Sequence, residues 1–219
     1  MIVYATHKGG RYLPIEESLQ EQPEGTRNIY VNLTNRCNCA CTFCLRNMKE
    51  MAEEHSLWLK QEPTVAEVEQ ELAALPWEKI GEVVFCGFGE PTLRLEALVE
   101  LLHFVKEKYP EHATRLNTNG LGELEHGHEI ASAFRGILDT VSISLNAASA
   151  EKYFELTRAK YGLEAYEGML DFAVHCKEYV PQVVLTIVDH VTSAEDIEKC
   201  RKICESRGLA LRVRPYEDS

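Results

Sequence analysis

Four cysteines lie within the stretch NRCNCACTFCLRN, at Cys37, Cys39, Cys41 and Cys44. In a chain whose first residues, MIVYATHKGGRYLP, lack the charged and apolar regions of a signal peptide, we expect thiols to be reduced. A tight cysteine cluster then indicates metal binding or catalysis rather than structural disulfides. The sequence therefore predicts a metal site in this loop.

Two ligand sets fit the loop. Cys37, Cys41 and Cys44 form the spacing C-x3-C-x2-C, which can hold three irons of a cubane cluster and leave the fourth iron open. An open coordination position is the mark of a reactive metal site. All four cysteines together form C-x-C-x-C-x2-C and could hold a structural zinc ion, although the run lacks the two separated pairs of a typical zinc finger.

The elements that position this loop follow a repeated pattern. Short β-branched runs alternate with amphipathic helical patterns, which predicts βα units around a parallel sheet. We expect strands at residues 28–34, 82–86, 114–117, 140–145, 183–188 and 210–214. Helix signals lie between them: Thr64 and Glu67 form a capping box, residues 92–109 are helical up to Pro110, and Ser193 caps a helix that ends near Gly208.

The unusual sequences of the chain follow these strands. NRCNCACTFC, GFGEPT and NTNG follow the first three, Asn146 ends the fourth, and Asp189 with His190 follows the fifth. Parallel α/β folds build their active sites at the carboxyl ends of strands, so we expect these groups to converge. The arrangement fits either a partial barrel or a doubly wound sheet.

The remaining sequence adds little to this core. We expect one domain over residues 1–219, with residues 1–27 as an N-terminal extension made of a small hairpin at the barrel edge, turning at Gly9 and Gly10, and a polar loop. The His126-x-His128 pair and the Cys200/Cys204 pair are more simply explained by a polar surface and by packing.

Composition limits the partners. The formal net charge is −12, from 23 basic and 35 acidic residues, which argues against a broad surface for a nucleic-acid backbone. A small-molecule substrate or a local docking patch fits better. No apolar stretch approaches the roughly 20 residues that a membrane helix needs, so we expect no membrane partner and a cytoplasmic protein.

The cysteine motif resembles that of a known family. C-x3-C-x-aromatic-C, with Phe43 as the aromatic residue, is similar to the signature of the radical S-adenosylmethionine superfamily. The resemblance implies a partial (β/α)6 TIM-like barrel of parallel strands. It also implies one [4Fe-4S] cluster held by Cys37, Cys41 and Cys44, with Cys39 outside the ligand set. S-adenosylmethionine would bind the open iron and be cleaved reductively to a 5′-deoxyadenosyl radical.

The resemblance also assigns cofactor contacts. Gly87, Phe88, Gly89 and Glu90 resemble the family's glycine-rich motif, in which the acidic side chain holds the methionine amino group. The other implied contacts come from later strands: Asn117 and Asn119 face the cofactor, Ser144 and Asn146 contact the ribose, Arg158 pairs with the methionine carboxylate, and Val188 lies against adenine. No residue is indicated as a catalytic acid or base.

The same resemblance implies partners and leaves the reaction open. It implies a low-potential electron donor such as flavodoxin or ferredoxin, and hydrogen abstraction from an unknown small-molecule or protein substrate. VNLTNRCNCACTFCLRN and GFGEPT also resemble the TatD-associated radical SAM subgroup. The alternatives are an activase for a glycyl radical enzyme and a non-catalytic zinc or iron–sulfur binding protein.

Overall fold

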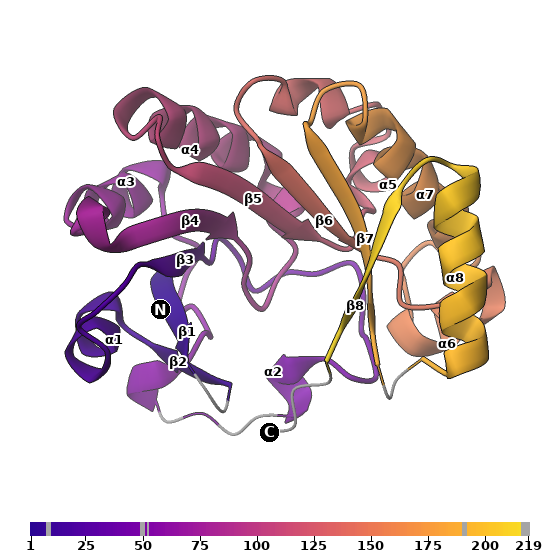
Figure 1. The fold of residues 1–219 in the computed structure, drawn as a ribbon, viewed down its shortest axis with the longest axis horizontal. Coiled ribbons are helices and arrows are strands. Elements are labelled where there is room, and N and C mark those ends of the chain that lie inside the picture. Colours follow the sequence, from indigo (N-terminus) through magenta and orange to yellow (C-terminus); the bar gives the residue numbers. More distant parts are fainter. Residues whose placement is uncertain (8–9, 49–50, 52, 190–191, 216–219) are drawn as a thin grey trace.

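The computed structural model describes residues 1–7, 10–48, 51, 53–189 and 192–215. Within them a curved sheet of eight strands has the order β2-β1-β3-β4-β5-β6-β7-β8, and each pair from β3 to β8 is parallel (Figure 1). The strands are β1 (Val3–His7), β2 (Arg11–Leu13), β3 (Arg27–Val31), β4 (Ile80–Phe85), β5 (Ala113–Thr118), β6 (Thr140–Ser144), β7 (Gln182–Val188) and β8 (Ala210–Arg214).

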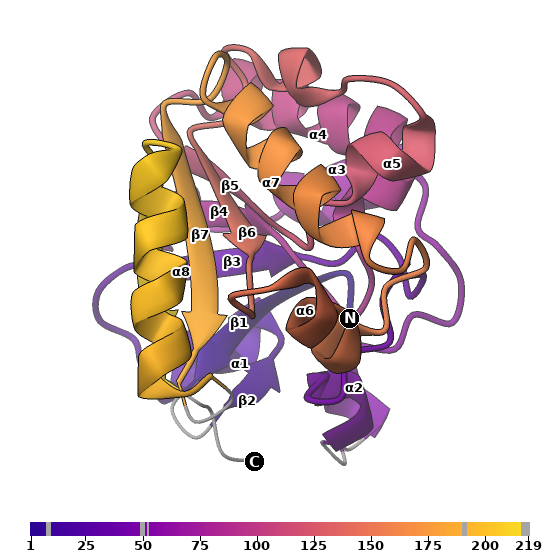
Figure 2. The same cartoon turned by 90° about the vertical axis from the view of Figure 1, so that its right-hand side faces the viewer.

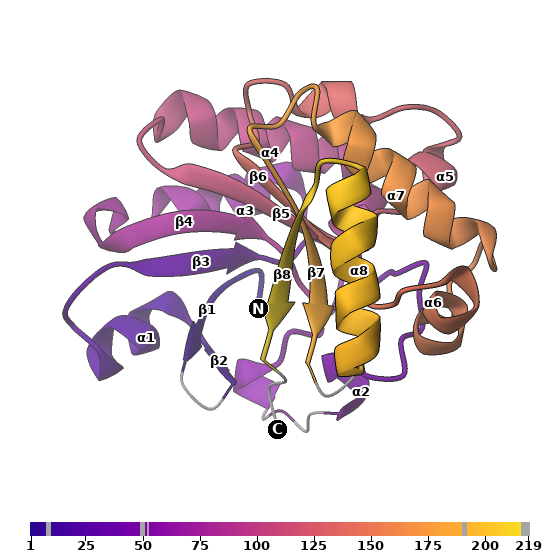
Figure 3. The ribbon, with the colours of Figure 1, turned by 45° about the vertical axis from the view of Figure 1, so that its right-hand side comes forward.

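Helices cover the convex face of this sheet. The longer ones, α3, α4, α7 and α8, lie outside the strands, while α6 lies near the carboxyl ends of β6 and β7 (Figures 2 and 3). The α-helices are α1 (Ile15–Glu21), α2 (Leu45–Met48), α3 (Val65–Ala73), α4 (Leu95–Lys108), α5 (Gly122–His126), α6 (Ala150–Thr157), α7 (Glu164–Cys176) and α8 (Ala194–Ser206). Short 3₁₀ turns are η1 (Glu53–His55), η2 (Trp77–Lys79), η3 (Pro91–Arg94) and η4 (Ala131–Phe134). No helix in the described ranges is long and apolar enough to cross a membrane.

The two faces of the sheet differ in chemistry, as β5 shows. Thr114, Leu116 and Thr118 are buried beneath the helices, whereas the alternate residues Arg115 and Asn117 are only partly buried and line a cavity on the concave face. Successive side chains of a strand point to opposite faces, so the pattern follows directly from the strand geometry. The convex face forms the apolar core, and the concave face keeps polar groups for a ligand.

The observed sheet confirms the predicted fold class, an α/β fold with a partial, TIM-like barrel. The barrel is not closed, because β2 and β8 are the two ends of the strand order. The N-terminal hairpin lies at the edge, as predicted: β1 pairs antiparallel with β2 and also with β3, which extends the parallel sheet. Gly9 of the predicted turn lies outside the described residues.

One N-terminal prediction was wrong. The segment up to residue 27 was expected to be loop, but residues 15–21 form the helix α1. Ile15 is buried in the main core and Leu19, four residues later, packs against that core, so one side of the helix is apolar. The polar residues between them hide this two-residue signal in the sequence.

The other boundaries differ by a few residues. The predicted first strand ends three residues early, because Asn32, Leu33 and Thr34 leave the sheet to begin the cysteine loop. The helix predicted at 92–109 consists of the turn η3 followed by α4. Both predicted helix starts are confirmed: Thr64 and Glu67 form a capping box, and the Ser193 hydroxyl accepts a bond from the Asp196 amide at 3.1 Å.

Removing the α3 cap should destabilise the protein measurably. In Thr64→Ala the Glu67 amide, now bonded to the Thr64 hydroxyl at 3.2 Å, loses its partner. We expect the free energy of unfolding, measured in urea, to fall by about 1 kcal/mol. Thr64→Ser keeps the hydroxyl and should unfold like the unmodified protein. Equal stability of the alanine and serine variants would contradict the capping role.

Candidate active site

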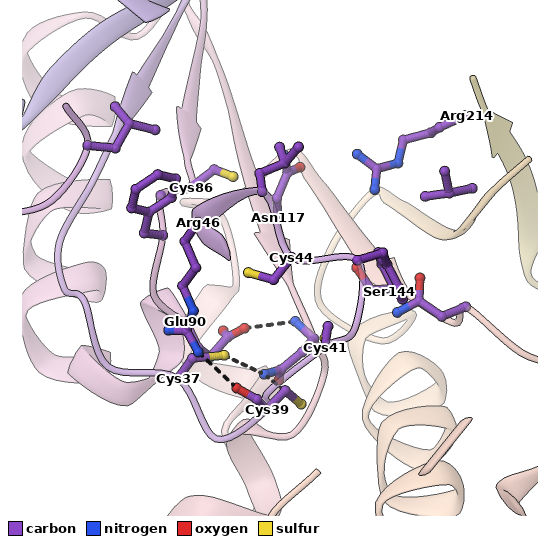
Figure 4. A pocket seen from close by; sticks show the side chains of 18 of the residues that line it. Cys37, Cys39, Cys41, Cys44, Arg46, Cys86, Glu90, Asn117, Ser144 and Arg214 are labelled. Carbon is purple, nitrogen blue, oxygen red and sulfur yellow. Dashed lines mark hydrogen bonds between the residues drawn. The ribbon is translucent and has the colours of Figure 1, made fainter. Parts of the chain in front are cut away.

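A cavity of about 490 Å³ lies inside the curved sheet, toward the carboxyl ends of its strands (Figure 4). Most of the site residues predicted from the sequence line it. They are Cys37, Cys41, Phe43, Cys44, Gly87, Phe88, Glu90, Asn117, Asn119, Ser144, Asn146 and Val188. Segments far apart in the sequence therefore converge here, as predicted for the groups after the first four strands; after the fifth, Asp189 does not line the cavity and His190 lies outside the described residues.

The cysteine loop is held by the end of a distant helix. The Ala40 amide donates to the Thr157 carbonyl at 2.8 Å, and the Thr42 amide donates to the Leu156 carbonyl at 2.9 Å. These carbonyls belong to the last turn of α6, where a helix leaves its carbonyls without internal partners. The loop thus satisfies the helix end, and the helix end fixes the loop.

The four thiols have different surroundings. Cys39 is 5% exposed and belongs to the apolar core, whereas Cys37, Cys41 and Cys44 are half-buried. Thiol hydrogen bonds with Cys37 and Cys41 hold the pKa of Cys39 far above its usual value, and the same bonds lower the pKa of Cys37 and of Cys41. Burial raises the pKa of Cys44. Of the four thiols, Cys39 is therefore the one that is packed into the core.

Glu90 is a buried carboxylate with four hydrogen-bond donors around it. Its Oε1 accepts bonds from the Thr92 amide at 3.1 Å, the Thr92 hydroxyl at 2.8 Å and the Thr118 hydroxyl at 2.7 Å. Its Oε2 accepts one bond, from the Asn119 amide at 2.8 Å. Burial raises the pKa of Glu90, although each of these bonds favours the charged form. Because Oε2 has a single partner and the residue lines the cavity, it can accept a further bond from a ligand.

Asn119 extends this network to the cysteines. Its side-chain nitrogen donates to Asn38 Oδ1 at 2.6 Å and lies 3.6 Å from Cys39 Sγ and 3.8 Å from Cys37 Sγ. The dashed lines of Figure 4 run through this group of side chains. One residue therefore touches both the buried carboxylate and the thiol loop.

The glycines after β4 are required for close packing of two loops. A Cβ on Gly89 would lie 2.2 Å from the Thr34 carbonyl oxygen and 2.5 Å from the Arg36 carbonyl oxygen. A Cβ on Gly87 would lie 2.0 Å from Asn32 Oδ1. The structure shows that they let the Glu90 loop lie against the start of the cysteine loop, where the Glu90 amide donates to the Arg36 carbonyl at 2.8 Å.

Two predicted site residues lie apart from the cavity lining. Gly89 lies behind Glu90, against the cysteine loop. Arg158 is exposed and caps the C-terminus of α6 with a left-handed φ of 48°. Its predicted bond to a cofactor carboxylate is not supported by this position. What Arg158 does here is end α6 next to the carbonyls that hold the cysteine loop.

The cavity fits a polar ligand. Three polar atoms on residues that line it are buried with no hydrogen-bond partner: Asn117 Oδ1, the Tyr153 hydroxyl and Arg115 Nε. Buried polar groups are normally paired, and Arg27 Nε and Asn32 Oδ1, on residues outside the cavity lining, are unpaired as well. In the described part of the chain, no three Cys, His, Asp or Glu side chains surround a point that could hold a single metal ion. Three thiols facing one cavity fit a cluster with one open iron, together with an organic cofactor.

Sequence reasoning missed several residues of the cavity. Cys86, Tyr153, Arg115, Arg212 and Arg214 all line it. The signal for three of them was present in the strands ATRLNT and ALRVR, where polar residues occupy alternate positions. Which face is concave cannot be read from one strand, since it depends on how the whole sheet curves.

The fold and the site define a parallel α/β barrel protein with a thiol loop at the carboxyl ends of its strands. The chain belongs to the radical SAM superfamily, whose model matches residues 31–203. The cofactors of this family are a [4Fe-4S] cluster and S-adenosylmethionine, and a member needs a reductant and a substrate.

Among curated proteins the chain is similar to GTP 3′,8-cyclases. It is 32% identical over 192 residues to the GTP 3′,8-cyclase of Corynebacterium glutamicum strain R, covering 85% of this chain and 48% of that protein. It is 29% identical over 189 residues to GTP 3′,8-cyclase 2 of Mycobacterium tuberculosis strain H37Rv, covering 85% of this chain and 49% of that protein. The chain thus spans about half the length of these relatives.

Solved structures support the fold. A radical SAM methyltransferase from Sphaerobacter thermophilus aligns with a TM-score of 0.59 at 15% identity, covering 87% of this chain and 66% of that one. Methylornithine synthase aligns with a TM-score of 0.57 at 16% identity, covering 85% and 52%. At these identities the likeness shows the fold alone.

A methyl group at Gly89 should disturb the contact between the Glu90 loop and the cysteine loop. Gly89→Ala drives a Cβ into two backbone oxygens of the cysteine loop. We expect the free energy of unfolding to fall by about 1–3 kcal/mol and the iron bound after anaerobic reconstitution to fall with it. Urea unfolding and iron analysis would measure the two effects.

Gly168→Ala is the matched control. Its Cβ would lie 2.6 Å from Cδ1 and 2.9 Å from Cγ of the Leu124 side chain, so it also forces a shift, but outside the two loops. It should retain the iron even where it loses some stability. If Gly89→Ala behaves like this control, the packing of the two loops does not support the site.

Proposed function

We propose that this protein is an enzyme that cleaves S-adenosylmethionine reductively at a [4Fe-4S] cluster and removes hydrogen from a substrate. The observation that supports the proposal is the C-x3-C-x2-C loop of a radical SAM chain, with all three cysteines lining one polar cavity. When bound, the cluster and cofactor would supply one electron and a 5′-deoxyadenosyl radical. The chain supplies binding, orientation and shielding from water.

We assign the cluster to Cys37, Cys41 and Cys44. They lie on one loop, line the cavity and are half-buried. We leave Cys39 out of this set because it is buried in the apolar core, whereas the other three are half-buried. Asn119 contacts both Cys37 and Cys39 and so fixes how the loop presents its thiols.

We assign the cofactor to the neighbouring ends of four strands. Glu90 Oε2 has room for a bond from the methionine ammonium, and the surrounding network holds this carboxylate in place. Asn117 offers an unpaired buried oxygen. Ser144 and Val188 are the last residues of β6 and β7 and line the same cavity, as do Phe43, Gly87, Phe88 and Asn146.

The electron donor and the substrate are not given by the residues of the site. We propose a low-potential donor, flavodoxin or ferredoxin, which would place the reaction in the cytoplasm. The curated relatives are named for cyclising GTP, but the chain spans about half of them, so their substrate is not transferred. The TatD-associated subgroup, the glycyl radical activase and the binding-protein alternatives stay predictions.

The direct test is spectroscopic and chemical. Protein reconstituted anaerobically and reduced with dithionite should give a [4Fe-4S] EPR signal that shifts when S-adenosylmethionine is added. 5′-Deoxyadenosine should accumulate, as measured by chromatography. A cluster signal that ignores the cofactor, with no deoxyadenosine, would instead support the non-catalytic alternative.

The ligand set has its own test. Cys41→Ala should lose most of the reconstituted iron and the EPR signal, because an essential thiolate is missing. Cys39→Ala should keep the iron and the signal, with a loss of stability of about 1 kcal/mol from the small core vacancy. Iron analysis and urea unfolding of the two variants would measure these effects. Equal iron loss in both variants would show that Cys39 is a fourth ligand.

A further inference from the structure

Positive charge gathers in the cavity of an acidic protein. The chain carries a formal net charge of −12, yet Arg115 of β5 and Arg212 and Arg214 of β8 all line the cavity. The side chain of Arg214 extends from β8 toward the cavity in Figure 4. Within the described residues, these arginines have one ion-pair partner, Glu82, whose Oε2 lies 2.9 Å from Arg115 Nη2. Three arginines against the single carboxylate of Glu82 leave this group with an excess of positive charge, while Arg46 and Glu90, which also line the cavity, carry opposite charges.

The sheet register puts these arginines on the concave face. Arg212 pairs with Thr186 and Arg214 pairs with Val188, so both share the face of Val188, which lines the cavity. Arg115 lies two residues before Asn117 on the same face of β5, about 7 Å nearer the start of the strand. Through β6 and β7, Arg115 is level with Gln182, four positions before the Thr186 partner of Arg212, yet both arginines line the same cavity and the charge of Arg115 acts on Arg212.

The three guanidinium groups repel one another. Burial and the positive charges of Arg115 and Arg214 lower the pKa of Arg212. Arg115 Nε is buried with no hydrogen-bond partner, although the same guanidinium is bonded to Glu82 through Nη2. Arg212 and Arg214 are exposed, so solvent screens much of this repulsion, and the part that remains raises the energy of the free protein. An anion bound among the three guanidinium groups would relieve that part.

We propose that Arg115, Arg212 and Arg214 bind the phosphate group of a small-molecule substrate. An excess of positive charge matches a phosphate dianion better than a carboxylate, and the planar guanidinium fork suits phosphate oxygens. The subsite lies toward the start of β5 from Asn117, one of the residues assigned to the cofactor. The assignment of this site to a substrate rests on the proposed function. Binding of an anion to the three arginines can be tested separately.

The test uses anaerobically reconstituted protein saturated with S-adenosylmethionine. Pyrophosphate and succinate are titrated by calorimetry at constant ionic strength, as phosphate and carboxylate probes. Pyrophosphate should bind at least tenfold more tightly than succinate. The double variant Arg212→Gln/Arg214→Gln should weaken pyrophosphate binding at least tenfold, whereas Arg201→Gln, which removes the same charge from the exposed face of α8, should leave it unchanged.

Arg115 needs a paired variant, because its removal alone would leave Glu82 without its partner. Arg115→Gln/Glu82→Gln removes both charges and should also weaken pyrophosphate binding at least tenfold. Circular dichroism and iron content would show that these variants are folded and loaded. Retained pyrophosphate binding in both double variants would overturn the proposal.

Two further outcomes separate this inference from the proposed function. A tenfold loss of S-adenosylmethionine affinity in Arg212→Gln/Arg214→Gln, with pyrophosphate binding unchanged, would assign the arginines to the cofactor carboxylate and overturn the phosphate site. Arginine-dependent pyrophosphate binding in a protein that forms no deoxyadenosine would uphold the anion site while refuting the proposed reaction.

Discussion

The candidate site depends on the hydrogen bonds that hold the buried carboxylate of Glu90 in place. A charged group in this position would cost several kcal/mol without partners, so the fold must place donors around it. Those donors come from Thr92, Thr118 and Asn119, on two separate segments. The loop after β4 and the end of β5 are therefore fixed relative to each other before any ligand binds.

The same loop reaches the thiols through the backbone. The Glu90 amide bonds to Arg36, and the absence of a side chain at Gly89 allows that approach. On the other side, the last carbonyls of α6 hold the amides of Ala40 and Thr42. The cysteine loop is thus held between two distant segments, which explains how a short irregular stretch can keep three thiols in place.

Much of this was readable from the sequence because it depends on local patterns. The alternation of strands and helices, the caps at Thr64 and Ser193, and the motif residues after each strand all follow from nearby residues. Arg158 shows where such reasoning ends. The resemblance implied a carboxylate partner for Arg158, which stays a prediction, but the left-handed backbone turn that Arg158 makes at the end of α6 is not revealed by a side-chain pattern. The helix α1 was missed for a related reason, since only its contact with the core makes Ile15 and Leu19 a buried side.

The cavity arginines raise the question of whether they serve only to protect the open edge of the sheet. Charged residues on an edge strand discourage pairing with another chain, and β8 is such a strand, so Arg212 and Arg214 alone fit that explanation. Arg115 does not, because β5 is hydrogen-bonded to β4 on one side and β6 on the other. A central strand needs no edge protection, and a partly buried cation there reduces stability unless something pairs with it. Glu82 pairs with part of that guanidinium and leaves Nε unpaired, so edge protection accounts for two of the arginines and ligand binding accounts for all three.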